Sequence, residues 1–130
     1  MYIMKRILII DDDPSTTESI ASFLAESGYE VQTAANGVEG LEMVKKNAPD
    51  LIVSDIRMPK LTGLELLYVL NGMKFEKPVI FISSYDYLDA SSTKLNIFAH
   101  IQKPINIFEL YRCIKNALMQ SEAAPVFSTN

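Results

Sequence analysis

The chain has 130 residues, of which 48% are hydrophobic, and this size and composition predict one globular domain with a packed core. Its formal charge of −4 argues against binding to nucleic acid or to an anionic membrane by charge alone. Its one cysteine excludes an internal disulfide and no apolar run approaches the roughly 18 residues of a transmembrane helix, so we expect a cytoplasmic domain without a membrane segment.

Five short apolar runs alternate with segments of helical period along the chain. Their length and their content of β-branched residues predict strands. The first, third and fourth runs are apolar at successive positions, which is typical of central parallel strands covered on both faces. In chain order, the predicted strands are residues 6–10, 29–34, 51–54, 79–83 and 99–102.

The first predicted helix has clear signals at both ends. Asp13 precedes a proline and is a good N-cap, although Ser15 with Glu18 forms a competing cap one turn later. An apolar stripe of helical period runs as far as Leu24, and Gly28 follows it as a C-cap. We therefore expect a helix between the first two strands.

Four further helices are predicted. Val38, Leu41 and Val44 form the apolar stripe of the second one. The third and the last begin at capping boxes, and a fourth, with little apolar period, is expected between the last two strands. The capping boxes pair Thr62 with Glu65 and Asn106 with Glu109, and the fourth helix covers about residues 86–96.

Alternation of strands and helices predicts an α/β fold with right-handed crossovers and helices on both faces of a parallel sheet. The commonest arrangement of five such strands is a flavodoxin-like (βα)₅ three-layer sandwich with strand order 2-1-3-4-5. Helical period is lost over the last ten residues. We therefore expect one domain over residues 1–120 and a flexible tail or linker stub over residues 121–130.

Polar side chains stand at the ends of four predicted strands. Asp11 and Asp12 follow the first strand, Asp55 the third, Ser83 ends the fourth, and Lys103 follows the fifth. Because the carboxyl ends of parallel strands share one edge of a sheet, where ligands bind, we expect these side chains to converge. Oxygen-only ligands of this kind suit Mg²⁺ or Mn²⁺, with water and a phosphate completing the coordination.

This arrangement resembles the receiver domain of two-component response regulators. The resemblance rests on four stretches in order, ILIIDDD, DLIVSDIRMPKLTGLELL, PVIFISS and KP, and covers about residues 5–119. It implies a domain that takes a phosphoryl group from a histidine kinase or a histidine phosphotransfer protein and signals to an output domain or protein. It further implies no enzyme activity beyond self-phosphorylation and self-dephosphorylation, and it admits a phosphorylation-dependent dimer.

The resemblance assigns roles to individual residues. Asp55 would be the nucleophile that accepts the phosphoryl group. Asp12 and Asp55 would hold Mg²⁺ directly, Asp11 through water, and Arg57 through its backbone carbonyl. Lys103 would pair with Asp55 and then with a phosphoryl oxygen, and family members often carry a cis peptide bond between this lysine and the following proline.

Further roles concern the switch and the lifetime of the phosphoryl group. Ser83 would bond a phosphoryl oxygen and turn inward. His100 stands at the switch position, where the family usually has Tyr or Phe, and its apolar strand favours a half-buried packing role over a catalytic one. Arg57 and Tyr85 would flank the line along which water attacks. A long cation and a bulky ring there predict a lifetime of minutes or longer.

A small Mg²⁺-dependent phosphatase of the haloacid dehalogenase type is the main alternative. DDDPS also fits the signature D-x-D-x-S, in which Asp11 would be the nucleophile and Asp13 the acid. However, no acidic pair follows Lys103 to complete the metal site, and Asp55 would have no role. A flavodoxin-like electron carrier is disfavoured because no Ser/Thr-rich phosphate loop follows the first strand. We interpret Asp13 as a helix cap rather than a metal ligand.

Overall fold

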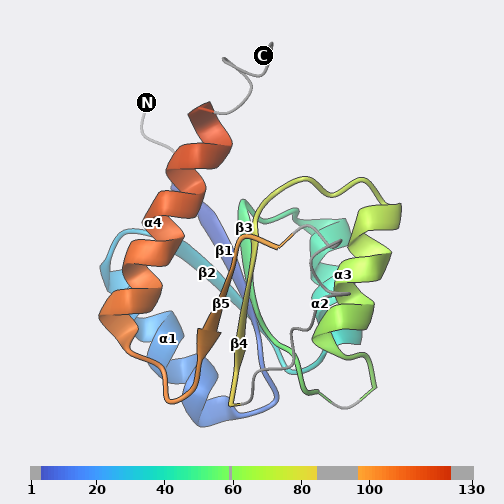
Figure 1. The fold of residues 1–130 in the computed structure, drawn as a ribbon, viewed down its shortest axis with the longest axis horizontal. Coiled ribbons are helices and arrows are strands. Elements are labelled where there is room, and N and C mark those ends of the chain that lie inside the picture. Colours follow the sequence, from blue (N-terminus) through green and yellow to red (C-terminus); the bar gives the residue numbers. More distant parts are fainter. Residues whose placement is uncertain (1–3, 59, 85–96, 124–130) are drawn as a thin grey trace.

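The structure is a computed structural model, and it describes residues 4–58, 60–84 and 97–123. Five strands form one parallel sheet in the order β2-β1-β3-β4-β5, which confirms the predicted fold class (Figure 1). The strands differ from the predicted ones by at most one residue at an end. They are β1 (Arg6–Ile10), β2 (Glu30–Ala34), β3 (Leu51–Asp55), β4 (Val79–Ser83) and β5 (Ala99–Gln102).

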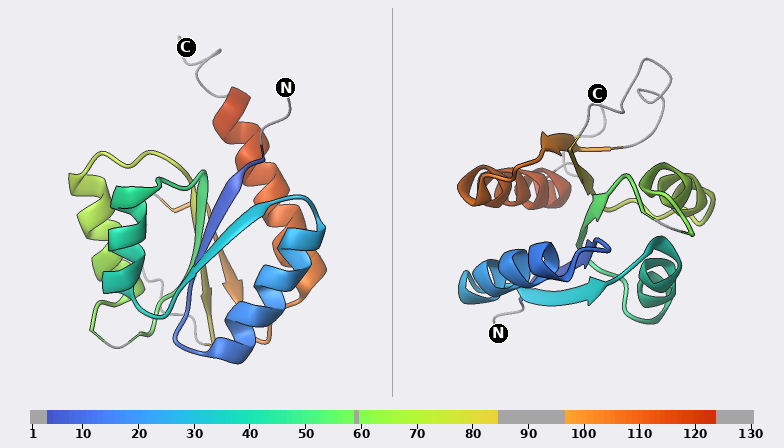
Figure 2. Two further views of the ribbon diagram at one scale, coloured as in Figure 1. Left: turned by 180° about the vertical axis from the view of Figure 1, so that it is seen from behind. Right: turned by 90° about the horizontal axis from the view of Figure 1, so that it is seen from below.

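The described residues contain four helices, arranged in two layers around the sheet. In the views of Figures 1 and 2, α1 and α4 cover one face of the sheet and α2 and α3 cover the other. None of these helices is long and apolar enough to cross a membrane. The helix predicted over residues 86–96 lies outside the described residues. The four helices are α1 (Pro14–Glu26), α2 (Gly37–Lys46), α3 (Gly63–Gly72) and α4 (Ile107–Ala123).

Strand β1 illustrates how the sheet is buried on both faces. Ile7 and Ile9 pack into the cluster beneath α1 and α4, whereas Leu8 and Ile10 pack into the cluster beneath α2 and α3. All four side chains have no exposed surface, as expected for a central strand whose side chains alternate between two covered faces. The end of this strand is therefore a rigid support for the residues that follow it.

The start and the end of α1 agree with the prediction. The Asp13 carboxylate accepts hydrogen bonds from the backbone N–H of Ser15 at 3.1 Å and from the hydroxyl of Thr16 at 2.8 Å. Asp13, and not the competing Ser15, is therefore the N-cap, a role typically worth about 1 kcal/mol. Gly28 lies directly beyond the C-cap Ser27 with φ of 100°, a conformation that favours glycine.

The buried face of α2 differs from the predicted one. The sequence assigns Val38 to the apolar stripe, but this side chain is 45% exposed, and the buried residues are Gly37, Gly40 and Val44. Hydrophobic periodicity does not detect a glycine, because a residue without a side chain adds nothing to the stripe. A helix that packs through glycine can bring its backbone unusually close to its neighbours.

The two remaining helices begin at the predicted capping residues, Thr62 and Asn106. Thr62 and Glu65 form a reciprocal capping box at the start of α3, with hydrogen bonds of 2.9 and 3.1 Å. At the start of α4, the side chain of Asn106 accepts two backbone N–H groups, at 3.0 and 3.1 Å. Helix α4 continues to Ala123, so its last three residues belong to the segment that the sequence predicts as a tail. Residues 124–130 lie outside the described residues.

Candidate functional site

Three carboxylates meet at the edge of the sheet where the strands end. Asp11 follows β1 and Asp55 is the last residue of β3, and these two strands are neighbours. Asp12 completes the group, and one carboxylate oxygen of each residue lies within 4.8 Å of the others. Asp11 and Asp55 are 2% and 5% exposed, whereas Asp12 is open to solvent. We call these three residues the acid cluster.

Backbone hydrogen bonds extend the sheet into the loops that carry the site. Each of these bonds starts from an N–H just beyond the end of one strand and reaches a carbonyl at the end of the neighbouring strand. The first residue of each loop therefore has a fixed position relative to the sheet. The bonds join Asp11 to Ala34 (3.1 Å), Ile56 to Ile82 (3.3 Å) and Lys103 to Ser83 (2.7 Å).

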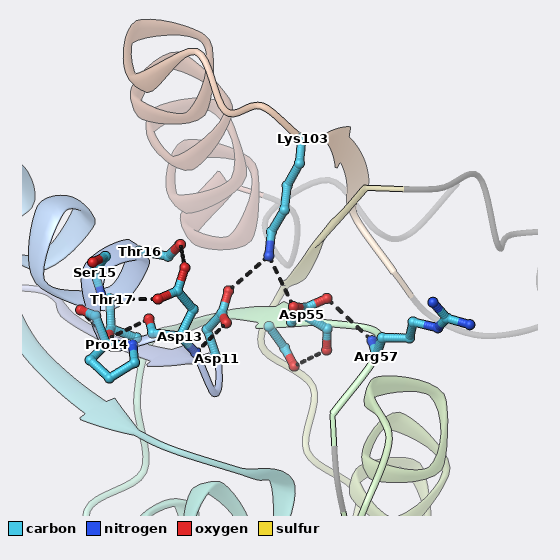
Figure 3. A network of polar contacts seen from close by, with 10 residues as sticks. Asp11, Asp13, Pro14, Ser15, Thr16, Thr17, Asp55, Arg57 and Lys103 are labelled. Atoms are coloured by element: carbon cyan, nitrogen blue, oxygen red, sulfur yellow. Dashed lines mark hydrogen bonds and ion pairs between the residues drawn. The ribbon is translucent and has the colours of Figure 1, made fainter.

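The ammonium group of Lys103 bridges two of the acids. Its Nζ lies 3.0 Å from Oδ2 of Asp55 and 3.3 Å from Oδ2 of Asp11, and Figure 3 shows the side chain reaching between the two carboxylates. The sequence predicts the pair with Asp55 but not the contact with Asp11. The peptide bond between Lys103 and Pro104 is cis, as the resemblance implies. This lysine compensates part of the charge of two buried acids.

Burial and neighbouring charges shift the pKa values of Asp11 and Lys103. Burial raises the pKa of Asp11, and the charge of Asp55 adds to this effect, while the N–H of Asp13 and the ammonium of Lys103 oppose it. For Lys103, burial acts to lower the pKa, but the two carboxylates outweigh it, so that the pKa of this lysine is raised. The ammonium therefore stays charged at neutral pH.

The raised pKa of Asp11 predicts a specific pH dependence of stability in metal-free protein. When the pKa of a carboxyl group is higher in the folded state than in the unfolded chain, its protonated form favours folding. This stabilising contribution is fully present below the unfolded pKa and is lost as the pH rises through the folded pKa. Ionised Asp11 is therefore a cost at neutral pH. In the presence of a chelator, Asp11→Asn should raise the melting temperature by a few degrees near neutral pH, and this gain should vanish below about pH 3.

Thermal melts across this pH range check the prediction. Glu42→Gln, which neutralises an exposed acid on α2, is the control and should give no comparable gain. A gain for Asp11→Asn that is as large in acid as at neutral pH would contradict the assignment, because protonated Asp11 carries no charge to remove.

Three of the other predicted site residues, Ser83, Arg57 and His100, lie within the described part of the chain. Ser83 ends β4 and is 1% exposed. Arg57 donates its backbone N–H to Oδ1 of Asp55 at 3.2 Å, and its side chain is exposed. His100 is half-buried on β5, and its Nε2 has no hydrogen-bond partner in the described part of the chain. Tyr85 lies outside the described residues.

Asp13 is occupied as a helix cap rather than as a member of the acid cluster. Its carboxylate bonds the first turn of α1, and its backbone N–H donates to Oδ1 of Asp11 at 2.9 Å (Figure 3). A phosphatase of the alternative type needs this carboxylate to exchange a proton with the substrate. The capping geometry does not favour that role.

The donor set of the acid cluster fits a divalent cation. All its side-chain ligands are carboxylate oxygens, which Mg²⁺ and Mn²⁺ prefer, and the cluster is partly open to solvent at Asp12. Three carboxylates and one ammonium leave two net negative charges, which matches the charge of such an ion. The fit is chemical: the residues present are those that could hold the cation.

A groove of about 540 Å³ lies beside the site, between α1 and the segment that follows β5. Lys103 and Phe23 both line it. The ring of Phe23 packs edge-on against Phe108 and against Tyr111, each with centroids 5.8 Å apart, and Phe108 is 66% exposed. An apolar surface therefore adjoins the polar site.

Comparisons with known proteins agree on one family. Residues 7–115 match the response regulator receiver domain. The chain is 33% identical over 120 residues to the transcriptional regulatory protein GlrR of Escherichia coli, covering 91% of this chain and 27% of GlrR. It is also 33% identical over 119 residues to the response regulator MprA of Mycobacterium tuberculosis, covering 90% of this chain and 52% of MprA. The chain thus spans about half or less of the length of these curated relatives.

Solved structures give the same result. A CheY-like response regulator receiver domain protein from Methanospirillum hungatei superposes with a TM-score of 0.87 at 34% identity, covering 92% of this chain and 98% of that one. A receiver domain protein from Clostridium thermocellum gives a TM-score of 0.84 at 29% identity, with the same coverage of 92% and 98%. These matches give no support to the phosphatase alternative.

Proposed function

This chain belongs to the family of response regulator receiver domains, and on that basis we propose that it accepts a phosphoryl group on the carboxylate of Asp55. The observation that carries the proposal is the environment of this carboxylate. It is buried at the end of β3, its oxygens lie beside those of Asp11 and Asp12, and the ammonium of Lys103 is 3.0 Å away.

The donor is the phosphohistidine of a histidine kinase or of a histidine phosphotransfer protein. An oxygen of Asp55 attacks phosphorus and forms a P–O bond as the P–N bond breaks, and the released imidazole nitrogen takes up a proton. Two anions must approach each other in this step, so their repulsion has to be offset. Lys103 supplies positive charge for this purpose from the protein itself, and Mg²⁺ bound at the acid cluster would supply more of it.

The remaining residues divide between cation and phosphoryl group. Asp12 and Asp55 would hold the ion directly, Asp11 through water, and Arg57 through its backbone carbonyl. Ser83 donates its hydroxyl to a phosphoryl oxygen and turns inward as it does so. His100, on the strand beside β4, responds to that movement as the switch residue. The family resemblance, together with the acid cluster, supports these assignments.

The partner surface is the first half of α1 with the segment that follows β5, over about residues 15–23 and 105–108. The groove between them and the exposed ring of Phe108 support this assignment, because an apolar surface beside the acceptor suits a docking protein. The domain acts in the cytoplasm and signals to a downstream output domain or protein, and the family resemblance admits a dimer of the phosphorylated form. It contributes no direct binding of nucleic acid.

Phosphoryl uptake from acetyl phosphate tests the function. In the presence of Mg²⁺ we expect one phosphoryl group per chain, detected by intact-mass spectrometry, and none when the metal is chelated. A phosphatase would instead release phosphate over many turnovers and retain no adduct. Absence of a Mg²⁺-dependent adduct under conditions that phosphorylate another receiver domain would overturn the proposal.

We further predict that the phosphoryl group lasts for minutes or longer. The family resemblance implies that Arg57 and Tyr85 flank the line along which water attacks phosphorus. The long cation of Arg57, which is exposed, and the bulky ring of Tyr85 would hinder water there, and neither offers a carboxylate to activate it. Arg57→Asn combined with Tyr85→Glu should shorten the lifetime by about 100-fold, because a carboxylate can orient and activate water.

The decay of phosphorylated protein after removal of the donor, with Mg²⁺ kept, measures this lifetime. Tyr85→Phe keeps the ring and serves as the matched control, with an expected lifetime close to that of the unaltered chain. Decay within seconds in the unaltered chain would refute the shielding role of these two positions.

A further inference from the structure

The described residues of the loop between β3 and α3, 56–58 and 60–62, are held at several points. Ile56 and Met58, its first and third residues, are 4% and 7% exposed and pack into the cluster beneath α2 and α3. Arg57 lies between them. Lys60 has φ of 72°, a left-handed conformation that is uncommon for a non-glycine residue. Contacts from outside the loop also restrain it.

One such contact is at the far end of the loop, at the first residue of α3. A methyl group placed on Cα of Gly63 would lie 2.5 Å from the carbonyl oxygen of Asp55 and 2.9 Å from Cα of Ile56. The N–H of Gly63 also donates to the carbonyl of Ile56 at 2.8 Å. The start of α3 thus rests directly on the backbone of the acceptor residue.

A second contact comes from the first turn of α2. A methyl group on Cα of Gly37 would lie 2.6 Å from the carbonyl oxygen of Leu61 and 2.8 Å from its Cβ. Gly37 does not have a left-handed backbone, so this close approach to Leu61, rather than its own conformation, is what requires glycine.

The first turn of α2 is itself fixed. The buried side chain of Asn36, its N-cap, accepts the N–H of Glu39 at 3.0 Å, and the side chain of Glu39 accepts the N–H of Ala35 at 3.2 Å. The preceding strand β2 is joined to the acid cluster by the bond from Asp11 to Ala34. The backbone at Gly37 is therefore held in place and limits how far the loop can move toward α2.

We propose that Gly37 is a positioning residue: the first turn of α2, in backbone contact with Leu61, holds the loop so that Arg57 and Asp55 are correctly placed for the cation. The inference rests on the proposed function, because it concerns the same site. Gly37 touches neither the ion nor the phosphoryl group and acts only through the loop. A methyl group there must displace Leu61, because a carbonyl oxygen and a Cβ cannot rotate away.

The chain offers two matched controls for the variant Gly37→Ala. In Gly40→Ala the new methyl group also enters the buried face of α2, but its nearest neighbours are the side-chain atoms Cδ1 and Cγ1 of Ile10, at 2.4 and 3.0 Å, so this variant crowds the same face without meeting the loop. In Gly72→Ala, at the end of α3, the new methyl group meets no atom within 4 Å. All three changes favour helix by intrinsic propensity, so propensity alone cannot separate them.

Binding of Mn²⁺, followed by the electron paramagnetic resonance signal of the free ion, tests the inference without any phosphoryl transfer. We expect Gly37→Ala to bind about tenfold more weakly than the unaltered chain, as is common when a residue behind a metal ligand is changed. Gly72→Ala should bind as the unaltered chain does, and Gly40→Ala, which crowds Ile10 but not the loop, should weaken binding less than Gly37→Ala does. Circular dichroism establishes that each variant is folded under the conditions of the titration.

The outcomes separate this inference from the function on which it rests. Unchanged affinity in Gly37→Ala, while the unaltered chain binds Mn²⁺, overturns the positioning role and leaves the cation site standing. Failure of the unaltered chain to bind overturns the site and the inference together. If Gly37→Ala does not fold, Leu61→Gly removes the Cβ and the rest of the side chain that Gly37 faces. This variant should also weaken binding, and wild-type affinity in it refutes the inference.

Discussion

Asp55→Asn should abolish the phosphoryl adduct formed with acetyl phosphate and Mg²⁺. The asparagine amide has nearly the shape of the carboxylate but is not a nucleophile, so the P–O bond cannot form. Lys103 keeps its second contact, the one with Asp11 at 3.3 Å, and the variant should therefore stay folded. Intact-mass spectrometry of the treated variant measures the result.

Asp13→Asn is the matched control for this experiment. Asparagine caps a helix as well as aspartate does, so this variant should keep both its stability and its adduct. A phosphatase that acts through Asp11 and Asp13 predicts the reverse pattern: Asp13→Asn would lose activity, and Asp55→Asn would keep it. An adduct that survives Asp55→Asn would move the nucleophile to another residue.

Mg²⁺ should stabilise the folded domain, and Asp12→Ala should remove this response. An ion that binds only the folded state stabilises it by about 1.4 kcal/mol at ten times its dissociation constant, which raises the melting temperature of a domain of this size by a few degrees. Asp12 is exposed, so its removal costs little packing. Without Mg²⁺ the variant should be at least as stable as the unaltered chain, because repulsion within the acid cluster is relieved.

Thermal melts with and without Mg²⁺ measure this difference. Asp13→Ala provides the contrast, since it removes the N-cap of α1 and should cost about 1 kcal/mol but should keep the full response to Mg²⁺. Equal Mg²⁺ shifts in the unaltered chain and in Asp12→Ala would refute the cation site.

The sheet could be predicted from the sequence because each strand is marked by a pattern of apolar residues within a short segment of the chain. The run from Ile7 to Ile10 is apolar at every position, which only a strand covered on both faces explains well, and the topology of alternating strands and helices then has few solutions. The convergence of Asp11, Asp55 and Lys103 followed from the same reasoning, because each of them stands at the end of a strand. Main-chain direction alone brings them to one edge.

Contacts that depend on the depth of packing could not be predicted in this way. The second ion pair of Lys103, with Asp11, depends on where a flexible side chain comes to rest between two strands. The orientation of α2 depends on Gly37 and Gly40, whose contribution is the absence of side-chain atoms, and the sequence pattern instead favours Val38 as the buried position. Such close approaches emerge only once the elements are packed.

The ion pairs of Lys103 also have a consequence for the order in which the site is completed during synthesis. Its ammonium meets a carboxylate 92 residues earlier in the chain, and it follows the last strand of the sheet. A nascent chain that has been made only as far as β4 already carries all three acids, but it lacks the group that compensates them. The protein's own compensating charge therefore arrives together with closure of the sheet edge by β5. On the function proposed above, a chain that ends before β5 lacks one of the two sources of positive charge that phosphoryl uptake requires.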